Sequence, residues 1–277
     1  MREENPEAAY WNETGGERWV ENIDRLEAML AVMNRHLLER AAPQVGERVL
    51  DIGCGGGVTS AAFADAVGAS GHVDGADISA VILDVARARY ADRGNLNFIA
   101  ADAGVHPFAP GTCDLITSRF GVMFFPEPTT AFANLLRAGR SGGRLVFLCW
   151  RSLPENPWMG EPAAAAFSIL PRPEKPDPDA PGPFSLADPE KIQRILDAAG
   201  FRDITLTPID EMLNLGEFAE ALDFMTKMGP TAEPLKEAPP ELRDTAIEAM
   251  RAAMAAHETP EGLIMPAATW LVEATIA

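Results

Sequence analysis

The sequence has few of the residues that build disulfide frameworks, membrane spans or basic surfaces. Its 277 residues include only three cysteines, which are widely spaced. This excludes a disulfide framework and the paired spacing of a zinc site, and we expect no bound metal. No run of about 18 uncharged apolar residues occurs, so no membrane association is expected. The N-terminal segment MREENPEAAYWNE is acidic and unlike a signal peptide, which favours a cytoplasmic protein.

Positive charge is also scarce. Lysine and arginine total 23 against 41 aspartate and glutamate residues, giving a net charge of −18 and a pI near 4.6. Without a basic cluster, such a chain repels phosphate backbones, so we expect no nucleic-acid partner and no large polyanionic substrate. The hydrophobic content of 47% is normal for a chain with a large core. We expect one domain over residues 1–277, as a monomer or homodimer.

What the sequence does have is a glycine-rich stretch, VLDIGCGGG, over residues 49–57. Three apolar strand formers lead into Gly53, and helix-like residues resume at Val58. Glycine is favoured where the backbone takes positive φ or touches a ligand closely. A strand, a glycine turn and a helix place backbone N–H groups and a helix N-terminus over one spot, which suits a nucleotide-like ligand.

The residues after this stretch alternate between strand and helix patterns. Strands are predicted over 48–53, 71–78, 95–102, 113–118 and 142–150, and helices over 58–67, 80–92 and 126–140. Such alternation predicts an α/β fold with a doubly wound, mainly parallel sheet, Rossmann-like and covered on both faces.

The flanks differ in character. Apolar spacing predicts one helix over 17–42, after a break at Gly15-Gly16, and a proline-rich extended loop over 153–183. A helix from Pro189 to Gly200, a strand over 204–209, helices in two or three pieces over 217–257 and a strand over 263–276 follow. The predicted segments are an N-terminal helical cover (1–45), a ligand-binding core (46–150), a proline-rich lid (151–186) and a C-terminal helical cap with strands (187–277).

Two kinds of dinucleotide-like ligand compete for the glycine turn. The nicotinamide fingerprint Gly-x-Gly-x-x-Gly would need its third glycine at Val58. The chain instead has acids near the ends of three successive strands, namely Asp51, Asp77 and Asp102. A carboxylate there can accept hydrogen bonds from ribose hydroxyls, and parallel sheets bind ligands at this edge.

These elements resemble the motifs of class I S-adenosylmethionine-dependent methyltransferases, in particular the small-molecule type of ubiquinone and menaquinone biosynthesis. The resemblance runs through VLDIGCGGG, GADIS, AADAG and CDLITSRFGVMFF in order, over about residues 45–150, with a tail over 185–209. It ends in LLRAGRSGGRLVFLCW, where Ser141 replaces the proline that the family usually has before two glycines.

The resemblance implies an S-adenosyl-L-methionine cofactor and a set of residues around it. Asp51 would lie near the methionine ammonium, Asp77 would hold the ribose hydroxyls, and Asp102 would accept from the adenine amine. The other implied cofactor-binding residues are Gly53, Cys54, Gly55, Ile78, Ala101, Ala103 and Ser118. Asp51 and Asp102 also have a simpler interpretation, in which each caps backbone N–H groups of a turn.

The sulfonium of the cofactor is already activated, so the protein mainly aligns the acceptor. A base is needed only if the acceptor loses a proton, and His106 and His36 are the candidates. Arg119 is the third candidate catalytic residue, which could steer an acceptor or simply pair with an acid. Phe124, Trp158, Phe224 and Met225 are candidates for contact with a hydrophobic or aromatic acceptor, although each could be core material. Tyr10, Trp11 and Trp19 are candidates for closing over the cofactor. Nucleic-acid methylation is disfavoured by the negative charge and by the sequence SRFG after the fourth strand, which stands in place of an Asn-Pro-Pro-Tyr or Asp-Pro-Pro-Tyr motif.

Two other functions stay open at this point. The first is a nicotinamide-dependent oxidoreductase, which the residue at position 58 disfavours. The second is a methyltransferase relative that binds cofactor without turnover and acts as an interaction module. The intact run from Asp51 to Gly57 argues against lost binding but does not exclude lost catalysis.

Overall fold

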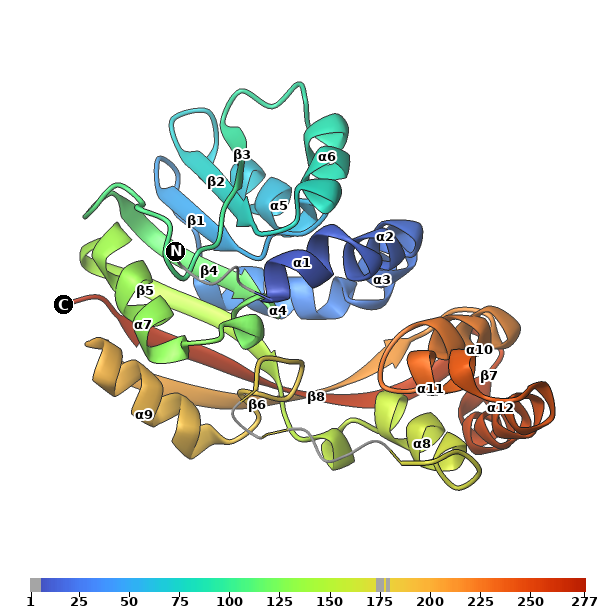
Figure 1. Cartoon of the computed structure of the whole chain (residues 1–277). Coiled ribbons are helices and arrows are strands. Elements are labelled where there is room, and N and C mark those ends of the chain that lie inside the picture. The colour runs from blue at the N-terminus through green and yellow to red at the C-terminus, as the bar shows by residue number, and fades with distance from the viewer. Residues whose placement is uncertain (1–5, 173–176, 178–179) are drawn as a thin grey trace.

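The computed structural model describes residues 6–172, 177 and 180–277, and it places one mixed sheet at the centre of the molecule (Figure 1). The strands run in the order β3-β2-β1-β4-β5-β8-β6, and β7 pairs with β8 off this path. Their bounds are β1 Arg48–Ile52, β2 His72–Asp77, β3 Leu96–Ala100, β4 Cys113–Arg119, β5 Gly139–Trp150, β6 Arg202–Asn214, β7 Glu258–Thr259 and β8 Gly262–Thr275.

The first five strands are mutually parallel, and β8 is antiparallel to both β5 and β6. This confirms the predicted doubly wound, mainly parallel sheet. All five parallel strands therefore point their carboxyl ends toward the same edge, and the connection from β3 to β4 crosses to the other side of β1, so the strand order reverses between β1 and β4. Ligands of open α/β sheets bind at that point.

Helices cover both faces of the sheet. On one face α4 (Ala31–Ala41) contacts β4 and β5, and α5 (Val58–Val67) contacts β1, β2 and β3. Figure 1 shows α7 (Pro128–Ala138) and α9 (Pro189–Ala199) on the opposite face, where they pack together against β5 and β6. The helix α6 (Ala80–Arg89) packs beside β3, and the predicted cap holds, because Ser79 Oγ accepts from the N–H of Ile82 at 3.2 Å.

The core consists of aliphatic side chains from the strands and of phenylalanines from α5, from α7, from β5 and from the turn after α9. Phe63, Phe132, Phe147 and Phe201 are at most 1% exposed. Phe132 contacts Phe147 and Phe201, with ring centroids 5.5 and 6.4 Å apart. Burial of each such ring contributes about 2–3 kcal/mol, which makes this layer a main source of the sheet's stability.

The N-terminal segment differs from the single helix predicted over 17–42. It forms α1 (Pro6–Asn12), α2 (Thr14–Glu21), α3 (Ile23–Met29) and α4, with turns at Asn22 and Leu30. The Asn22 side-chain amide donates to the carbonyl of Arg18 at 2.8 Å and so competes with the helical hydrogen bonds. The predicted break at Gly15-Gly16 is also wrong, since both glycines lie inside α2.

The strands β6 and β8 extend beyond the carboxyl end of β5. Trp150, the last residue of β5, pairs with Thr269, whereas β6 continues to pair with β8 as far as Ile264. Figure 1 shows the helices α8 (Pro157–Ala166), α10 (Phe218–Lys227), α11 (Ala232–Glu237) and α12 (Pro240–Met254) gathered on this two-stranded extension. These helices, called the cap below, therefore lie on the ligand-binding side of the sheet. The prediction of helices broken near Gly229 and Pro239 is confirmed.

The prediction of an extended loop over 153–183 is wrong in its first half. Residues Leu153–Glu155 form a short 3₁₀ turn, and α8 follows it despite containing Pro162. The fully buried Asn156 holds this segment, because its side chain donates to the carbonyl of Ala268 at 3.0 Å and accepts from the N–H of Ala268 at 2.9 Å. Several of the prolines on which the prediction rested lie outside the described residues.

Two further 3₁₀ turns, Val122–Phe124 and Ala255–His257, complete the described elements. No helix within the described ranges is long and apolar enough to cross a membrane. The segment boundaries predicted at residues 45, 150 and 186 stay predictions.

Candidate functional site

The glycine turn after β1 is bound to the end of β2. Gly53, Gly55 and Gly57 have φ values of +64°, +52° and +82°, which side chains rarely adopt. The N–H of Gly53 donates to the carbonyl of Ala76 at 2.8 Å, and the N–H of Gly55 donates to Asp77 Oδ2 at 2.8 Å. The predicted cofactor-binding residues of the first two motifs are therefore brought together.

The turn after β4 touches the same glycine turn through backbone atoms. A Cβ added to Gly53 would lie 2.6 Å from the Cα of Gly121, so neither position has room for a side chain. Ser118 fixes this approach, since its hydroxyl donates to the carbonyl of Ile52 at 2.7 Å and accepts from the N–H of Gly121 at 3.1 Å. The predicted residue Ser118 thus lies at the site and joins its two turns.

Asp77 lies at the centre of this arrangement. Its second oxygen accepts from the N–H of Ser79 at 2.9 Å, so the carboxylate connects the glycine turn to the start of α6. Burial raises the pKa of Asp77, although hydrogen bonds from Ser79 and Gly55 oppose the shift. A carboxylate kept at this strand end despite its desolvation cost is a candidate ligand-binding group.

The end of β3 completes the adenine side predicted from the sequence. The N–H of Ala101 donates to the carbonyl of Asp77 at 2.8 Å, and Ala103 is 6% exposed. Asp102 Oδ1 accepts from the N–H of Gly104 at 2.9 Å, so it does cap a turn. This contact leaves the ligand-binding prediction for Asp102 in place, because a carboxylate accepts several hydrogen bonds.

The N-terminal helices cover the end of β2. The Asn12 side chain donates to the carbonyl of Ile78 at 3.0 Å and accepts from the N–H of Ala80 at 2.8 Å, and Ser79 Oγ donates to the carbonyl of Trp11 at 2.6 Å. Trp11 lies edge-to-face with Trp19 and with Phe124. Sequence reasoning had proposed the aromatic residues here but missed Asn12, whose role depends on contacts 66 residues away in the chain.

A buried polar cluster lies on the α3–α5 face of the sheet, below the N-terminal helices. Asp51 is 1% exposed and accepts a 2.6 Å hydrogen bond from Ser60, and burial raises its pKa to about 7. Arg119 and Glu27 form an ion pair of 2.7 Å between β4 and α3, with side chains 7% and 10% exposed. Within the described part of the chain, Asp51 Oδ1, Thr117 Oγ1, Arg119 Nη1 and Trp19 Nε1 are buried without a hydrogen-bond partner.

The three candidate catalytic residues lie in different places. Arg119 belongs to the cluster just described, and His106 follows β3, where its ring contacts Phe108. His36 pairs with Glu211 on β6 at 2.6 Å. This pair joins α4, which packs against β4 and β5, to the outermost strand of the sheet. The structure therefore does not bring the three together, and their catalytic roles stay predictions.

The candidate acceptor residues form two groups. Phe124 and Trp158 lie near the ends of β4 and β5, where Trp150 contacts Trp158 and stacks on Phe120 with ring centroids 4.1 Å apart. Phe224 and Met225 are buried in α10 of the cap. Sequence reasoning missed Phe120, which has a φ of +66° and is held in this strained conformation between Arg119 and Gly121.

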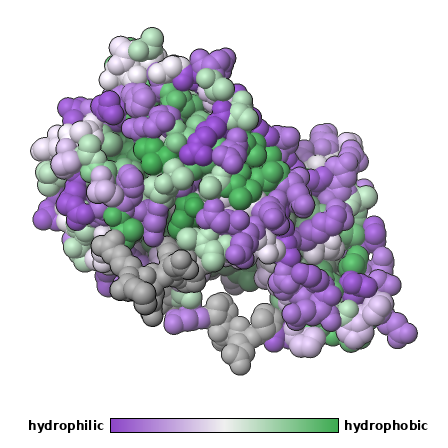
Figure 2. All heavy atoms as spheres, turned by 45° about the horizontal axis from the view of Figure 1, so that its top comes forward, coloured by the Kyte–Doolittle hydropathy of each residue, from purple (hydrophilic) through white to green (hydrophobic). Residues whose placement is uncertain are grey.

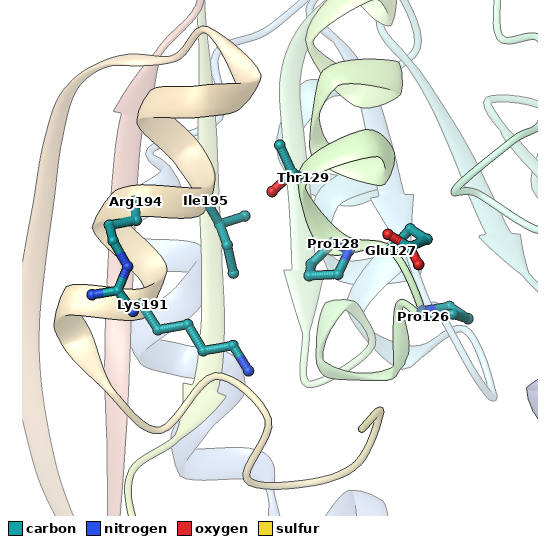
Figure 3. A pocket seen from close by; sticks show the side chains of 7 residues that line it. All are labelled: Pro126, Glu127, Pro128, Thr129, Lys191, Arg194 and Ile195. Carbon is teal, nitrogen blue, oxygen red and sulfur yellow. The ribbon is translucent and has the colours of Figure 1, made fainter. Parts of the chain in front are cut away.

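Two surface hollows occur among the described residues. One of about 430 Å³ lies between the start of α7 and one side of α9, where Lys191 and Ile195 face Pro128 (Figure 3). It contains none of the predicted site residues. A second, of about 330 Å³, lies between α3 and α10 and includes Arg25 and Phe224. The ion pair of Arg25 with Glu220 and that of Arg18 with Glu233 join the N-terminal helices to the cap.

The raised pKa of Asp51 leads to a stability prediction. Asp51→Asn is expected to stabilise the ligand-free protein at pH 8 by up to ~4 kcal/mol, because it removes a buried charge. The folded-state pKa of about 7 exceeds the ordinary value of 3.8, so the cost of ionising Asp51 grows as the pH rises from 3.8 to 7 and is complete above 7. Thermal unfolding of both proteins at pH 5 and pH 8 should give a larger difference at pH 8. An equal difference at both pH values would contradict the assignment.

Comparison with known proteins shows which families and proteins this chain resembles. Residues 49–143 match the family described as a methyltransferase domain. The chain is 40% identical over 140 residues to the demethylmenaquinone methyltransferase of Clavibacter sepedonicus, covering 48% of this chain and 55% of that protein. It is 36% identical over 117 residues to the aklanonic acid methyltransferase of a Streptomyces species, covering 42% and 53%. The chain thus spans about half the length of these curated relatives.

A solved structure extends the likeness in fold. The phosphoethanolamine N-methyltransferase 2 of Haemonchus contortus, in complex with S-adenosyl-L-methionine, superposes with a TM-score of 0.60 and 18% sequence identity. The superposition covers 97% of this chain and 59% of that one. At this identity the likeness shows the fold, which is the Rossmann-like fold of class I methyltransferases.

Proposed function

We propose that this chain, whose residues 49–143 match a methyltransferase domain, transfers a methyl group from S-adenosylmethionine to a hydrophobic or aromatic small molecule, at oxygen, nitrogen or carbon. The observation that carries this proposal is the charge at the carboxyl ends of β1, β2 and β4. The buried carboxyl of Asp51 lies close to two partly buried carboxylates, those of Asp77 and of Glu27 on α3, and to a single guanidinium, that of Arg119. Such a site favours a cationic ligand.

The residues present fit the cofactor. The glycine turn has no Cβ between the backbone and a ligand, and Asp51 Oδ1 is a buried acceptor without a partner in the described residues. The cofactor would supply an electrophilic methyl group on a sulfonium. Asp77 would hold the ribose hydroxyls, Asp102 the adenine amine, and Asp51 the ammonium. The same buried acids would repel the pyrophosphate of a nicotinamide dinucleotide, which argues against the oxidoreductase alternative.

The acceptor is proposed from the surroundings of the glycine turn. Beside Gly121, which touches Gly53, aromatic side chains from the ends of β4 and β5 and from α8 form a contacting cluster, namely those of Phe120, Trp150 and Trp158. Aromatic and apolar linings suit flat, uncharged acceptors. The face of the molecule in Figure 2 is mostly hydrophilic, with a hydrophobic patch near its middle. The net charge of −18 disfavours nucleic acid as the methyl acceptor. The names of the relatives, one acting on demethylmenaquinone and one on aklanonic acid, support an aromatic small molecule.

The experiment has two parts. Calorimetry with S-adenosylhomocysteine should give a micromolar Kd, whereas a fluorescence titration with NADH should show no binding. Methyl transfer is then screened with tritiated S-adenosylmethionine against phenols, amines and quinones. Binding of NADH in place of S-adenosylhomocysteine would refute the proposal. Tight binding of S-adenosylhomocysteine with no transfer to any acceptor class would favour the non-catalytic interaction module.

A further inference from the structure

The short helix α3 has two faces that contact different parts of the molecule. Ile23 and Glu27 are four residues apart and therefore lie on the same face. Ile23 covers the glycine turn, since a Cβ added to Gly56 would lie 2.5 Å from its Cδ1. Glu27 pairs with Arg119 of β4 at 2.7 Å. This inner face of α3 therefore lies against the proposed donor site.

Arg25 lies on the opposite side of α3 and contacts the cap. It is two positions from each of the two inner-face residues, and residues two apart point to different sides of a helix. Its guanidinium pairs with Glu220 of α10 and donates to the carbonyl of Leu215, which follows β6, at 3.2 Å. It also lies 5.8 Å from the ring centroid of Phe224 in α10. One side chain thus joins α3 to α10 and to the end of β6.

Side chains carry the connection between α3 and the cap. The hollow of about 330 Å³ lies between α3 and α10, so the two helices are bridged across it and are not closely packed there. A single exposed ion pair contributes little to stability, but Arg25 is only 23% exposed and adds a hydrogen bond and a cation–π contact to its pair. Arg18 of α2 provides a second ion pair, with Glu233 of α11.

We propose that Arg25 is a positioning residue that couples the donor site to the cap. A ligand bound between the glycine turn and α3 holds the inner face of α3 in place, and Arg25 on the outer face then holds α10 and the end of β6. The inference rests on the proposed function, in which this ligand is the methyl donor and the cap covers the acceptor. It follows that the acceptor side is fully ordered only after the donor has bound.

Hydrogen exchange of backbone amides tests this coupling without knowledge of the acceptor. Saturating S-adenosylhomocysteine should slow exchange in α10 of the full chain at least fivefold, the lower end of usual coupling between sites. Exchange in α9, on the opposite face of the sheet, should change less than twofold. In Arg25→Met the slowing in α10 should fall below twofold. Because coupling between two sites is reciprocal, the affinity of Arg25→Met for S-adenosylhomocysteine should fall by the factor of slowing that is lost, as measured by calorimetry.

Two further variants test the pair itself. Glu220→Gln removes the partner of Arg25 from an exposed position on α10 and should also reduce the slowing there. Arg40→Met is the matched control, because Arg40 of α4 pairs with Glu273, which lies beside β5 in the sheet and not in the cap. It should keep the full slowing in α10. Thermal unfolding checks that each variant is folded.

The outcomes separate this inference from the proposed function. Binding of S-adenosylhomocysteine without slower exchange in α10, or with equal slowing in α9 and α10, would overturn the coupling and leave the proposed function standing. Full slowing in Arg25→Met would overturn the role of Arg25. Failure of S-adenosylhomocysteine to bind the unmodified chain would overturn the proposed function and the coupling together.

Discussion

Replacement of Asp77 by alanine is expected to weaken S-adenosylhomocysteine binding by about 100-fold or more. The carboxylate accepts from the N–H groups of Gly55 and Ser79 and, in the proposed complex, from the ribose hydroxyls. Alanine leaves both N–H groups without their acceptor and removes the ribose contact. Calorimetry measures the affinity, and thermal unfolding checks that the protein remains folded.

Asp84→Asn is the matched control for this substitution. Asp84 lies on the exposed side of α6, the helix whose start Asp77 holds, and pairs only at the surface with Arg87. Its replacement should leave the affinity unchanged. An Asp77→Ala protein that is folded and binds S-adenosylhomocysteine within threefold of the unmodified chain would show that the ribose is held elsewhere.

Gly53→Ala is expected to have the second large effect. Its φ of +64° already disfavours a side chain by about 1–2 kcal/mol, and the added Cβ would meet the Cα of Gly121 at 2.6 Å. The two turns must then separate, so the protein should lose about 3 kcal/mol or more of stability. Binding of S-adenosylhomocysteine should fall by about 100-fold, because the glycine turn is displaced.

Gly111→Ala separates the backbone effect from the collision. Gly111 has nearly the same φ, +66°, but a Cβ there would have no heavy atom within 4 Å. This variant should lose only about 1–2 kcal/mol and bind normally. Urea unfolding and calorimetry on both variants measure the difference. Similar stability losses in the two would mean that the contact between the turns after β1 and β4 is not tight in solution.

The sheet could be predicted because each strand carries a local signal. Apolar runs ending in glycine or an acid define β1, β2 and β3, and their alternation with helices determines a parallel sheet. The helix boundaries in the N-terminal segment could not be predicted from the sequence, because the apolar spacing runs unbroken through the turns at Asn22 and Leu30. In α8 the prolines masked a helix that starts at Pro157, where a missing N–H costs nothing, and continues through a run of alanines.

The residues of the candidate site also fall into those that could be predicted from the sequence and those that could not. Residues near strand ends, such as Asp51 and Asp77, could be predicted because topology alone brings those ends together. The ion pair between Glu27 and Arg119 joins residues 92 positions apart in the chain, and neither carries a motif that points to the other. The left-handed backbone conformation of Phe120 could not be predicted from the sequence either, since phenylalanine does not favour it.

The extension of β6 and β8 beyond β5 has an evolutionary consequence. The cap rests on these strand ends, whereas the proposed donor site is built from β1 to β4 and from the N-terminal helices. Apart from Glu220 and Glu233, which pair with the N-terminal helices, residues of the cap can therefore be substituted without disturbing the groups proposed to hold the methyl donor. We expect descendants of this chain to diverge in acceptor preference by exchanging cap helices, while the segment from residue 49 to 143 stays recognisable across lineages.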